Sequence, residues 1–266
     1  LLDTGVFNED RYFDVFVEYA KNGPEDILVK ISAVNRGPDA AELHILPTLW
    51  FRNDWSEWIA ESNRTNKKPI IKQIKAQANV TVAEASHSLL GDFIFSCEGD
   101  VPLLFTENET NHEKLFPGTK NESPHVKDGI NDYVIHKAQD AVNPDKQGTK
   151  AAAHFRLTIG AGKTSVVSLR ITKKDSNSND TPFGKSFNTI LNNRLSEADE
   201  FYKSVIPSNV NTDEANVMRQ ALAGMLWSKQ FFFFDGDNWL DEHNSNPLHS
   251  GYKQARNSDW YHMLNM

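Results

Sequence analysis

The sequence has almost no cysteine, since Cys97 is the only one among its 266 residues. An internal disulfide framework is therefore excluded, and a reducing compartment is favoured over an oxidising one. Cys97 alternates with Phe93 and Phe95, as in a strand that faces a core, and no acid-base partner lies nearby in sequence to make it a reactive thiolate. We expect a buried structural thiol and not a nucleophile.

An excess of positive charge and long hydrophobic runs are also absent. The chain carries 28 basic and 36 acidic residues, a net charge of -8. Nucleic acids and anionic membranes reward clusters of Lys and Arg, so neither is expected as a partner. The longest apolar runs, such as 231–234, fall far short of the roughly 20 residues that cross a bilayer. A small, neutral partner fits this composition better.

Several motifs of cofactor and nucleophile chemistry are missing. No Gly-x-Ser-x-Gly elbow occurs, and the nine histidines include no pair at the spacing of a zinc-binding helix. Segment 160–164 (GAGKT) imitates a phosphate-binding loop, but Leu157 replaces the first glycine and strands flank the motif, so we expect a hairpin turn. Segment 235–239 begins like a calcium loop, but Trp239 occupies the third ligand position. The sequence predicts no cofactor and no metal.

What the sequence does contain is a change of hydrophobic period near Thr181. Before it, apolar residues alternate as in strands, at 13–19, 27–33, 43–47, 70–74, 79–83, 92–97, 103–106, 152–159 and 165–171. Short strands with turn signals between them predict an antiparallel β-sandwich. The polar segment between them, 107–150, is too long for a simple connection and is expected to be an ordered excursion.

After Thr181 the apolar residues recur every three or four positions. Thr181-Pro182 has the chemistry of an N-cap followed by a first-turn proline, which predicts a helix of about twenty residues that ends before Pro207. Asn211 and Glu214 form a predicted capping box for a second helix, with an apolar stripe over 218–226. Segment 231–240 is predicted as a short strand or an irregular crossing, and 241–258 as a loop.

Two clusters combine aromatic and polar residues. The first, 50–58 (WFRNDWSEW), holds three tryptophans among Arg, Asn, Asp and Glu at the end of a predicted strand, and the second, 256–262 (RNSDWYH), has a similar composition. A sugar presents a face of C–H groups and a rim of hydroxyls, which suits an indole beside planar polar groups. The alternative is that the indoles simply fill the end of the sandwich core.

Read in order, several segments resemble bacterial members of glycoside hydrolase family 63 and the related mannosylglycerate-hydrolase-like glycosidases. The segments are HILPTLWFRN (44–53), LLFTENETN (103–111), GINDY (129–133), EADEFY (197–202), MRQALAGMLWSKQ (218–230) and RN (256–257). The likeness extends over essentially the whole chain, and 218–230 is its most specific part.

The resemblance implies a mainly β chain with an α-helical C-terminal part. It divides the chain into an antiparallel β super-sandwich at 1–172 without its first strands, a linker at 173–182, and a linker helix with the start of an incomplete (α/α)6 barrel at 183–266. Its members are inverting glycosidases that use a carboxylic acid and a carboxylate, so an oligosaccharide or small glycoside, an α-linked glucoside or mannoside, is the expected substrate. The remainder of the barrel is the expected protein partner, and a cytoplasmic location is favoured.

The resemblance assigns no catalytic residue to this chain, because both family carboxylates are expected beyond Met266. Five acidic residues are tempting substitutes, but turn formation and loop capping are the better reading for Asp235, Asp237, Asp241, Glu242 and Asp259. The candidate substrate-binding residues that it singles out are Arg52, Asn53, Trp55, Arg256, Asn257 and Trp260. Two alternatives remain open at this point: a non-catalytic carbohydrate-binding sandwich, and an assembly module.

Overall fold

The computed structural model describes residues 2–5, 7–55, 67–75, 79–174, 181–228, 234–256 and 258–265. The chain forms two compact units, residues 1–195 and residues 196–266, and the junction lies within one long helix. The first unit consists mainly of strands and the second mainly of helices, so the predicted sandwich followed by helices is confirmed.

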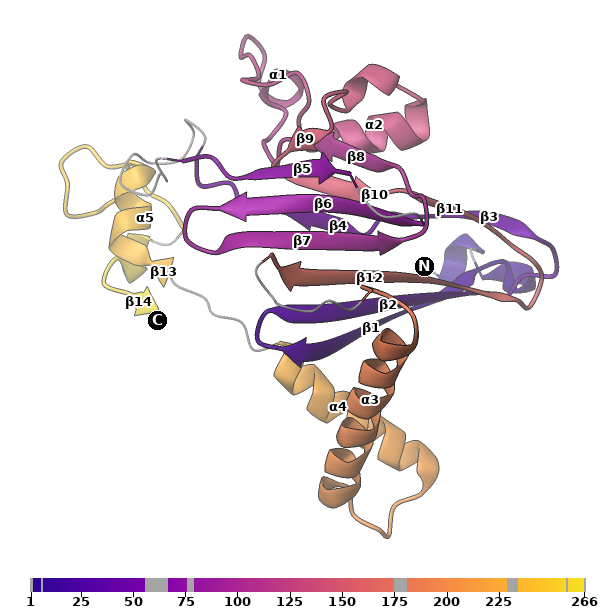
Figure 1. Cartoon of the computed structure of the whole chain (residues 1–266). Coiled ribbons are helices and arrows are strands. Elements are labelled where there is room, and N and C mark those ends of the chain that lie inside the picture. The colour runs from indigo at the N-terminus through magenta and orange to yellow at the C-terminus, as the bar shows by residue number, and fades with distance from the viewer. Residues whose placement is uncertain are drawn as a thin grey trace. The chain divides into compact units, whose positions relative to one another are not determined.

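The first unit contains a seven-stranded antiparallel sheet (Figure 1). Its strands, in spatial order, are β1 (Phe13–Gly23), β2 (Asp26–Asn35), β12 (Thr164–Lys173), β7 (Gly91–Glu98), β6 (Val80–His87), β5 (Ile70–Ile74) and β9 (Gln147–Gly148). Every second residue of β6 from Thr81 to Ala85 is buried, so this strand has one buried face. β2 is covered on both faces, because Ile31 packs in the main core and Leu28 packs on the opposite side.

A second layer is made of two smaller sheets. One has the order β4 (Thr48–Trp50), β10 (Lys150–Ala153) and β8 (Leu103–Thr106), and the other pairs β11 (Phe155–Ile159) with β3 (Ala41–Ile45). The core lies between the layers, where Ile71, Cys97 and Leu169 of the large sheet belong to one buried cluster with Phe105 and Ala151 of the small one. This interdigitation of two inner faces is what defines a sandwich.

Two strands predicted as continuous are each divided. Pro47 separates β3 from β4 because proline has no N–H to donate to a ladder, and its carbonyl accepts from the Ala153 N–H at 3.0 Å. His154 separates β10 from β11, and its N–H donates to the Pro102 carbonyl at 2.9 Å. The two breaks divide the second layer into its two small sheets.

The predicted hairpin at 160–164 is wrong, although the turn itself is present. β11 pairs with β3, whereas β12 pairs with β2 and β7, so the turn carries the chain from one layer to the other. Gly162 has the left-handed φ of 63° that the turn needs, and its N–H donates to the Asn35 carbonyl at 3.0 Å. The end of β2 thus provides the hydrogen bonds to this turn that the neighbouring strand of a hairpin would have provided.

The excursion between β8 and β10 is ordered, as predicted. It contains α1 (His112–Leu115), α2 (Gly129–His136) and the 3-10 turns η4 (Gln139–Ala141). Ile130 and Val134 on α2 pack against Leu104 of β8 and Ala152 of β10. The excursion therefore covers the three-stranded sheet of β4, β10 and β8 on the side away from the main core.

The long helix α3 (Lys185–Val205) has the predicted length but begins later than predicted. Thr181 is not its N-cap, because Phe183 is buried with Phe187 against Ala20 and Leu28, and Gly184 takes a left-handed φ of 99°. Burial of the Phe183 ring outweighs the capping preference of Thr181.

In the second unit, α4 (Thr212–Trp227) begins with the predicted capping box. The Asn211 side chain accepts from the Glu214 N–H at 3.0 Å, and the Asn211 N–H donates to the Glu214 carboxylate at 2.8 Å. Arg219 on α4 reaches back to α3, with an ion pair to Asp199 at 2.6 Å and a guanidinium 4.7 Å from the Tyr202 ring centroid. The two helices therefore form an α-hairpin.

The region after α4 is more helical than predicted. β13 (Phe234–Asp235) pairs with β14 (Leu264–Asn265), but α5 (Gly236–Glu242) replaces the expected strand or irregular crossing. The Asp235 carboxylate accepts from the Asn238 N–H at 3.2 Å and so caps this helix. The loop predicted from Asp241 onward begins where α5 ends, with a further 3-10 turn, η5, at Ser258–Trp260. None of the helices in the described segments has the length and apolar content of a membrane span.

Cys97 provides a test of the sandwich core. Its side chain is fully buried, and burial raises the pKa of its thiol to about 12. We expect the folded chain to react with a thiol-specific chromogenic reagent at least about a hundredfold more slowly than the chain in concentrated guanidinium chloride, because only the thiolate attacks. Since the chain has one thiol, stopped-flow absorbance reports Cys97 alone. Equal rates in both conditions would contradict the burial.

Candidate functional site

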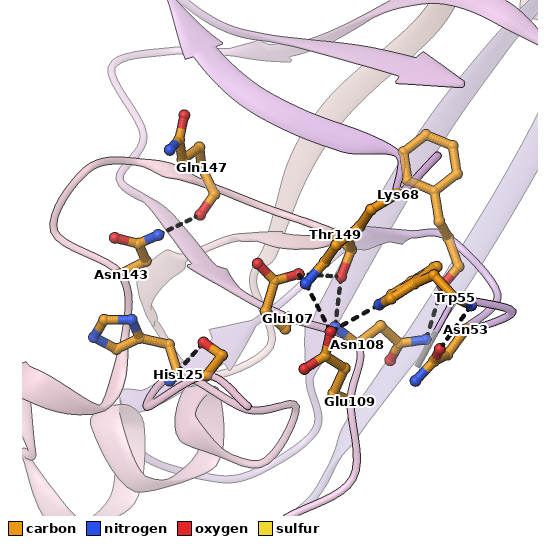
Figure 2. Close-up of polar contacts among 12 residues, drawn as sticks. Asn53, Trp55, Lys68, Glu107, Asn108, Glu109, His125, Asn143, Gln147 and Thr149 are labelled. Atoms are coloured by element: carbon orange, nitrogen blue, oxygen red, sulfur yellow. Dashed lines mark hydrogen bonds and ion pairs between the residues drawn. The ribbon is translucent and has the colours of Figure 1, made fainter. Parts of the chain in front are cut away.

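The first predicted cluster lies where three segments meet at one end of the small sheet. β4 and β8 each run antiparallel to β10 and therefore parallel to one another. The residues that follow Trp50 on β4 and Thr106 on β8 must then emerge beside the residue that precedes Lys150 on β10, which is Thr149. We call this arrangement the Trp55 cluster, comprising Asn53, Trp55, Lys68, Glu107, Asn108, Glu109 and Thr149 (Figure 2).

Two carboxylates and one ammonium form the centre of the Trp55 cluster. Glu109 accepts at Oε1 from the Trp55 indole N–H and from Lys68 Nζ, both at 2.7 Å. Glu107 accepts at Oε2 from the Thr149 hydroxyl at 2.7 Å and pairs with Lys68 at 3.2 Å. Lys68 Nζ also lies 5.8 Å from the centroid of the Trp55 ring (Figure 2). The indole is therefore held by its N–H and by a cation over its ring.

The backbone around these side chains is fixed by hydrogen bonds between the three segments. The Phe51 N–H donates to the Thr149 carbonyl at 3.0 Å, and the Asn108 side chain donates to the Phe51 carbonyl at 2.9 Å. The Asn108 N–H donates to the Thr149 hydroxyl at 2.7 Å, and the Glu107 N–H to the His125 carbonyl at 2.8 Å. The site is thus held on both sides by paired backbone, which preorganises its side chains.

Burial and charge decide the state of Lys68. Its partial burial alone would lower the pKa, but the hydrogen bond to Glu109 and the charge of Glu107 outweigh this, so the pKa of Lys68 is raised. The Glu109 side chain is 6% exposed and that of Lys68 is 41% exposed. A buried carboxylate is tolerated here because the ammonium reaches it from the solvent side.

The chemistry that this arrangement offers is hydrogen bonding. Lys68 bridges the two carboxylates through its ammonium group. No described residue donates to Oε2 of Glu109 or Oε1 of Glu107, which leaves each of these oxygens as an acceptor for a ligand hydroxyl. Acceptors beside an indole suit a sugar ring.

The three predicted residues of this loop differ in their contacts. Trp55 is central, as described. The Asn53 side chain accepts from the Trp55 N–H at 3.3 Å and thereby supports the loop. Arg52 is an exposed residue. The structure thus connects Trp55 and Asn53 directly, while the role of Arg52 stays a prediction.

The second predicted group lies in the helical unit. Arg256 is exposed, and the Trp260 side chain is 55% exposed, with its ring 6.4 Å from that of His262 in a stacked arrangement. Asn257 lies outside the described residues. No hydrogen bond within the described part of the chain joins Arg256 to Trp260, so their common role in binding also stays a prediction.

The acidic residues near the second group have structural contacts. Asp235 caps α5, and Asp237 and Asp241 both accept from the Asn246 side chain, at 2.8 and 2.6 Å. Asn246 is 2% exposed, so these bonds fix the loop that follows α5. Within the described ranges, no three His, Cys, Asp or Glu side chains gather as a metal site would require.

The sequence analysis missed Lys68, Glu107, Asn108, Glu109 and Thr149. Three of these, Glu107 to Glu109, stand within LLFTENETN, one of the segments that carries the family resemblance, so the resemblance could have identified them. Lys68 and Thr149 gave no local signal, because their contacts depend on residues 41 and 42 positions away. Only the pairing of β4, β10 and β8 brings them together.

Comparison with known proteins places these findings in context. No family model matches the sequence. The chain is 34% identical over 289 aligned positions to the uncharacterized protein YMR196W of Saccharomyces cerevisiae. This alignment covers 96% of the present chain. The chain spans 26% of the length of that yeast protein.

A solved structure with some similarity is that of a human-microbiome protein named as a kojibiose phosphorylase. The match has 11% identity and a TM-score of 0.28 and covers 87% of this chain and 23% of that chain. At this TM-score the two backbones share too little for the likeness to indicate an activity. The chain is therefore similar to part of a much longer yeast protein.

Proposed function

We propose that this chain is the sandwich and the first helical part of an inverting α-glycoside hydrolase of family 63 type that acts on α-linked glucosides or mannosides. In this proposal the catalytic acid and base lie in sequence beyond Met266, and the chain supplies binding groups. The helices from Lys185 onward are the linker helix and the start of an (α/α)6 barrel.

The observation that carries the proposal is the Trp55 cluster. Two segments of the family resemblance, 44–53 and 103–111, lie far apart in sequence. Glu109 belongs to the second segment and Trp55 follows the first by two residues, yet the two side chains share a 2.7 Å hydrogen bond. An indole held beside two carboxylates, each with one oxygen to which no described residue donates, fits the recognition of sugar hydroxyls. Supporting it further, Met225 and Leu226 of the predicted apolar stripe are 64% and 62% exposed, as the first helices of an unfinished barrel would be.

The activity is tested on the full-length protein that contains this chain. We expect it to hydrolyse at least one substrate from a panel of α-linked glucosides and mannosides, with the β-anomer as the first product in a time-resolved proton NMR spectrum. The chain by itself is expected to hydrolyse none. Release of the α-anomer, or no hydrolysis across the panel, would refute the proposal.

The role of the Trp55 cluster has its own test. In the full-length enzyme, Trp55→Ala is expected to raise KM about tenfold, a loss of about 1.4 kcal/mol of binding, because the ring contact with the sugar is removed. Trp50→Ala is the matched control: Trp50 is 55% exposed on β4 and lies outside the cluster, so its kinetics should not change. Equal effects of the two substitutions would disprove the assignment of Trp55.

The alternative is a non-catalytic carbohydrate-binding or assembly sandwich. Exposed apolar residues of α4, including the 70% exposed Trp227, favour assembly in particular. Isothermal titration of the chain with maltose- and mannose-like sugars, together with sedimentation analysis, distinguishes the carbohydrate-binding hypothesis from the assembly hypothesis. Micromolar affinity that Trp55→Ala abolishes would favour the binding module, and a stable oligomer would favour assembly.

A further inference from the structure

A pocket lies at the opposite end of the three-stranded sheet of β4, β10 and β8 from the Trp55 cluster. It is formed where β8 and β10 meet α2, β3 and β11, and its volume is about 420 Å³. Its polar and aromatic lining residues are His44, Asp100, Tyr133, Lys137, Gln139, His154, Phe155 and Arg156. We call it the His154 pocket. It shares no residue with the Trp55 cluster, so it needs an explanation of its own.

A chain of hydrogen bonds runs from a carboxylate through two imidazoles into this pocket. Glu42 Oε1 and His44 Nε2 are 2.7 Å apart, and His44 Nδ1 and His154 Nε2 are 3.0 Å apart. Arg156 donates to the same Glu42 oxygen at 3.1 Å. The hydrogen bonds from His44 and Arg156 lower the pKa of Glu42, so this carboxylate is ionised near neutral pH.

The ionised carboxylate fixes the proton on His44 and, when His44 is neutral, the tautomer of His154 as well. Glu42 can only accept, so Nε2 of His44 carries the proton. When His44 is neutral, its Nδ1 is then an acceptor, and the proton in the 3.0 Å contact belongs to Nε2 of His154. Nδ1 of a neutral His154 is consequently left without a proton and presents a lone pair.

The surroundings of His154 keep it neutral. Burial lowers its pKa, and the positive charges of Arg156 and Lys137 lower it further. The residue is 8% exposed, and no hydrogen bond within the described part of the chain involves its Nδ1. His154 Nδ1 lies in the wall of the pocket without a partner among the described residues, so a ligand can donate to it.

We propose that the His154 pocket binds a small hydroxylated ligand, a monosaccharide or a polyol, through a hydroxyl that donates to Nδ1 of His154. The donors beside it, Arg156 and Lys137, accept nothing and so complement the oxygen lone pairs of neighbouring hydroxyls. The Tyr133 ring meets the His154 ring edge-on, at 6.2 Å and 81°, and adds an aromatic wall. This is a separate binding site from the one proposed at Trp55.

A hydroxyl fits better than an anion or a metal ion. A fully deprotonated anion could not donate to the His154 lone pair, and the pocket also contains Asp100, while Arg156 is already paired with Glu42. A transition metal would use the lone pair but needs further ligands, and within the described segments no three metal-binding side chains gather. The ligand that satisfies Nδ1 is therefore a neutral donor.

The test is nitrogen-15 NMR of the chain labelled at histidine. We expect a non-protonated Nδ1 on His154 near neutral pH, and a shift of that resonance when glucose, mannose or glycerol is added. Inorganic phosphate and Zn²⁺ are the comparison probes. A protonated Nδ1, a response to phosphate or Zn²⁺ alone, or no response to any of the three hydroxylated probes would overturn the proposal.

Two variants and a pH series complete the test. His154→Phe keeps the ring but removes both nitrogens, and should weaken binding at least about tenfold. Arg156→Met, at an exposed position that does not threaten folding, should weaken it about threefold to tenfold. Binding should also weaken as the pH falls through the lowered pKa of His154, because a protonated Nδ1 cannot accept. Unchanged affinity in both variants would refute the assignment.

A control separates this site from the proposed enzyme site. Trp55→Ala should leave the His154 response to sugar unchanged, whatever its effect on hydrolysis. If Trp55→Ala abolished the response, the ligand would be bound at Trp55 and the His154 proposal would be wrong. Conversely, absence of hydrolysis by the full-length protein would not affect the NMR result, so the two proposals fail independently.

Discussion

Replacing Arg170 by alanine is expected to lower the free energy of unfolding by about 3–5 kcal/mol, the usual cost of leaving one charge of a buried pair unpaired. Arg170 on β12 donates from Nε and Nη2 to the two oxygens of Asp26 on β2, at 2.8 and 2.6 Å. Its side chain is 4% exposed and that of Asp26 is 16% exposed. The substitution removes a two-point bond between adjacent strands and leaves the carboxylate behind.

Arg170 also connects the sandwich to the start of the helical part. Its Nη1 donates to the Pro182 carbonyl at 3.3 Å, one residue before the buried Phe183. We therefore expect Arg170→Ala to loosen the segment that leads into α3 as well, which hydrogen exchange at the amides of Phe183 to Phe187 would detect. A larger increase in exchange rate at these amides than at the amides of β6, comparing the variant with the unsubstituted chain, would support this connection.

The matched control is Arg36→Ala. Arg36 pairs with Asp14 at 2.6 Å, but its side chain is 48% exposed, so its loss should cost at most about 1 kcal/mol. Urea unfolding followed by tryptophan fluorescence measures both variants. Equal costs for the buried and the exposed pair would contradict the importance assigned to Arg170.

The pH dependence of the Arg170 variant has a definite sign. Burial raises the pKa of Asp26, but the hydrogen bonds from Arg170 and Asn22 lower it more, so the folded pKa lies below the ordinary value. A group with a depressed folded pKa stabilises the fold above its unfolded pKa, and this contribution is lost as pH falls through the folded pKa. The cost of Arg170→Ala should therefore be largest near neutral pH and shrink at about pH 3, below the ordinary aspartate pKa.

The second large effect is expected for Gly148→Ala, a cost of about 3 kcal/mol from overpacking. A Cβ built at Gly148 would lie 2.3 Å from the Thr106 carbonyl oxygen and 2.9 Å from the carbonyl carbon. Both atoms are backbone of β8, so a side-chain rotation cannot relieve the clash. β9 and β8 would have to separate at the base of the Trp55 cluster.

Separation of these strands should also alter the site, because the next residue is Thr149. Its hydroxyl donates to Glu107 and accepts from the Asn108 N–H, so a shift of Thr149 moves both. Gly23→Ala serves as control, since a Cβ there meets nothing within 4 Å, and it should change stability by at most about 0.5 kcal/mol. Thermal unfolding measures both, and equal melting temperatures of the two variants would refute the close-contact argument.

Local patterns predicted most of the elements correctly. Alternation found nearly every strand of the large sheet, because the side chains on the inner face of a strand recur at every second residue. The capping box at Asn211 and Glu214 was predicted because its two bonds are made within four residues. The errors fall where a distant contact overrides the local preference: Phe183 is buried against β1 and β2, so the helix begins at Lys185 and not at Thr181.

The amino-acid sequence by itself determined the order of most strands and of the two long helices, the buried state of Cys97 and the candidate residue Trp55, because each depends on neighbours within a few positions. Only the tertiary structure decided that the turn at 160–164 joins two layers, and that Lys68 and Thr149 stand beside Glu107 and Glu109. It alone brought His44 to His154, 110 positions later in the chain. The physical reason is that strand pairing sets long-range contacts, and a hydrophobic pattern specifies which face of a strand is buried without specifying its partner.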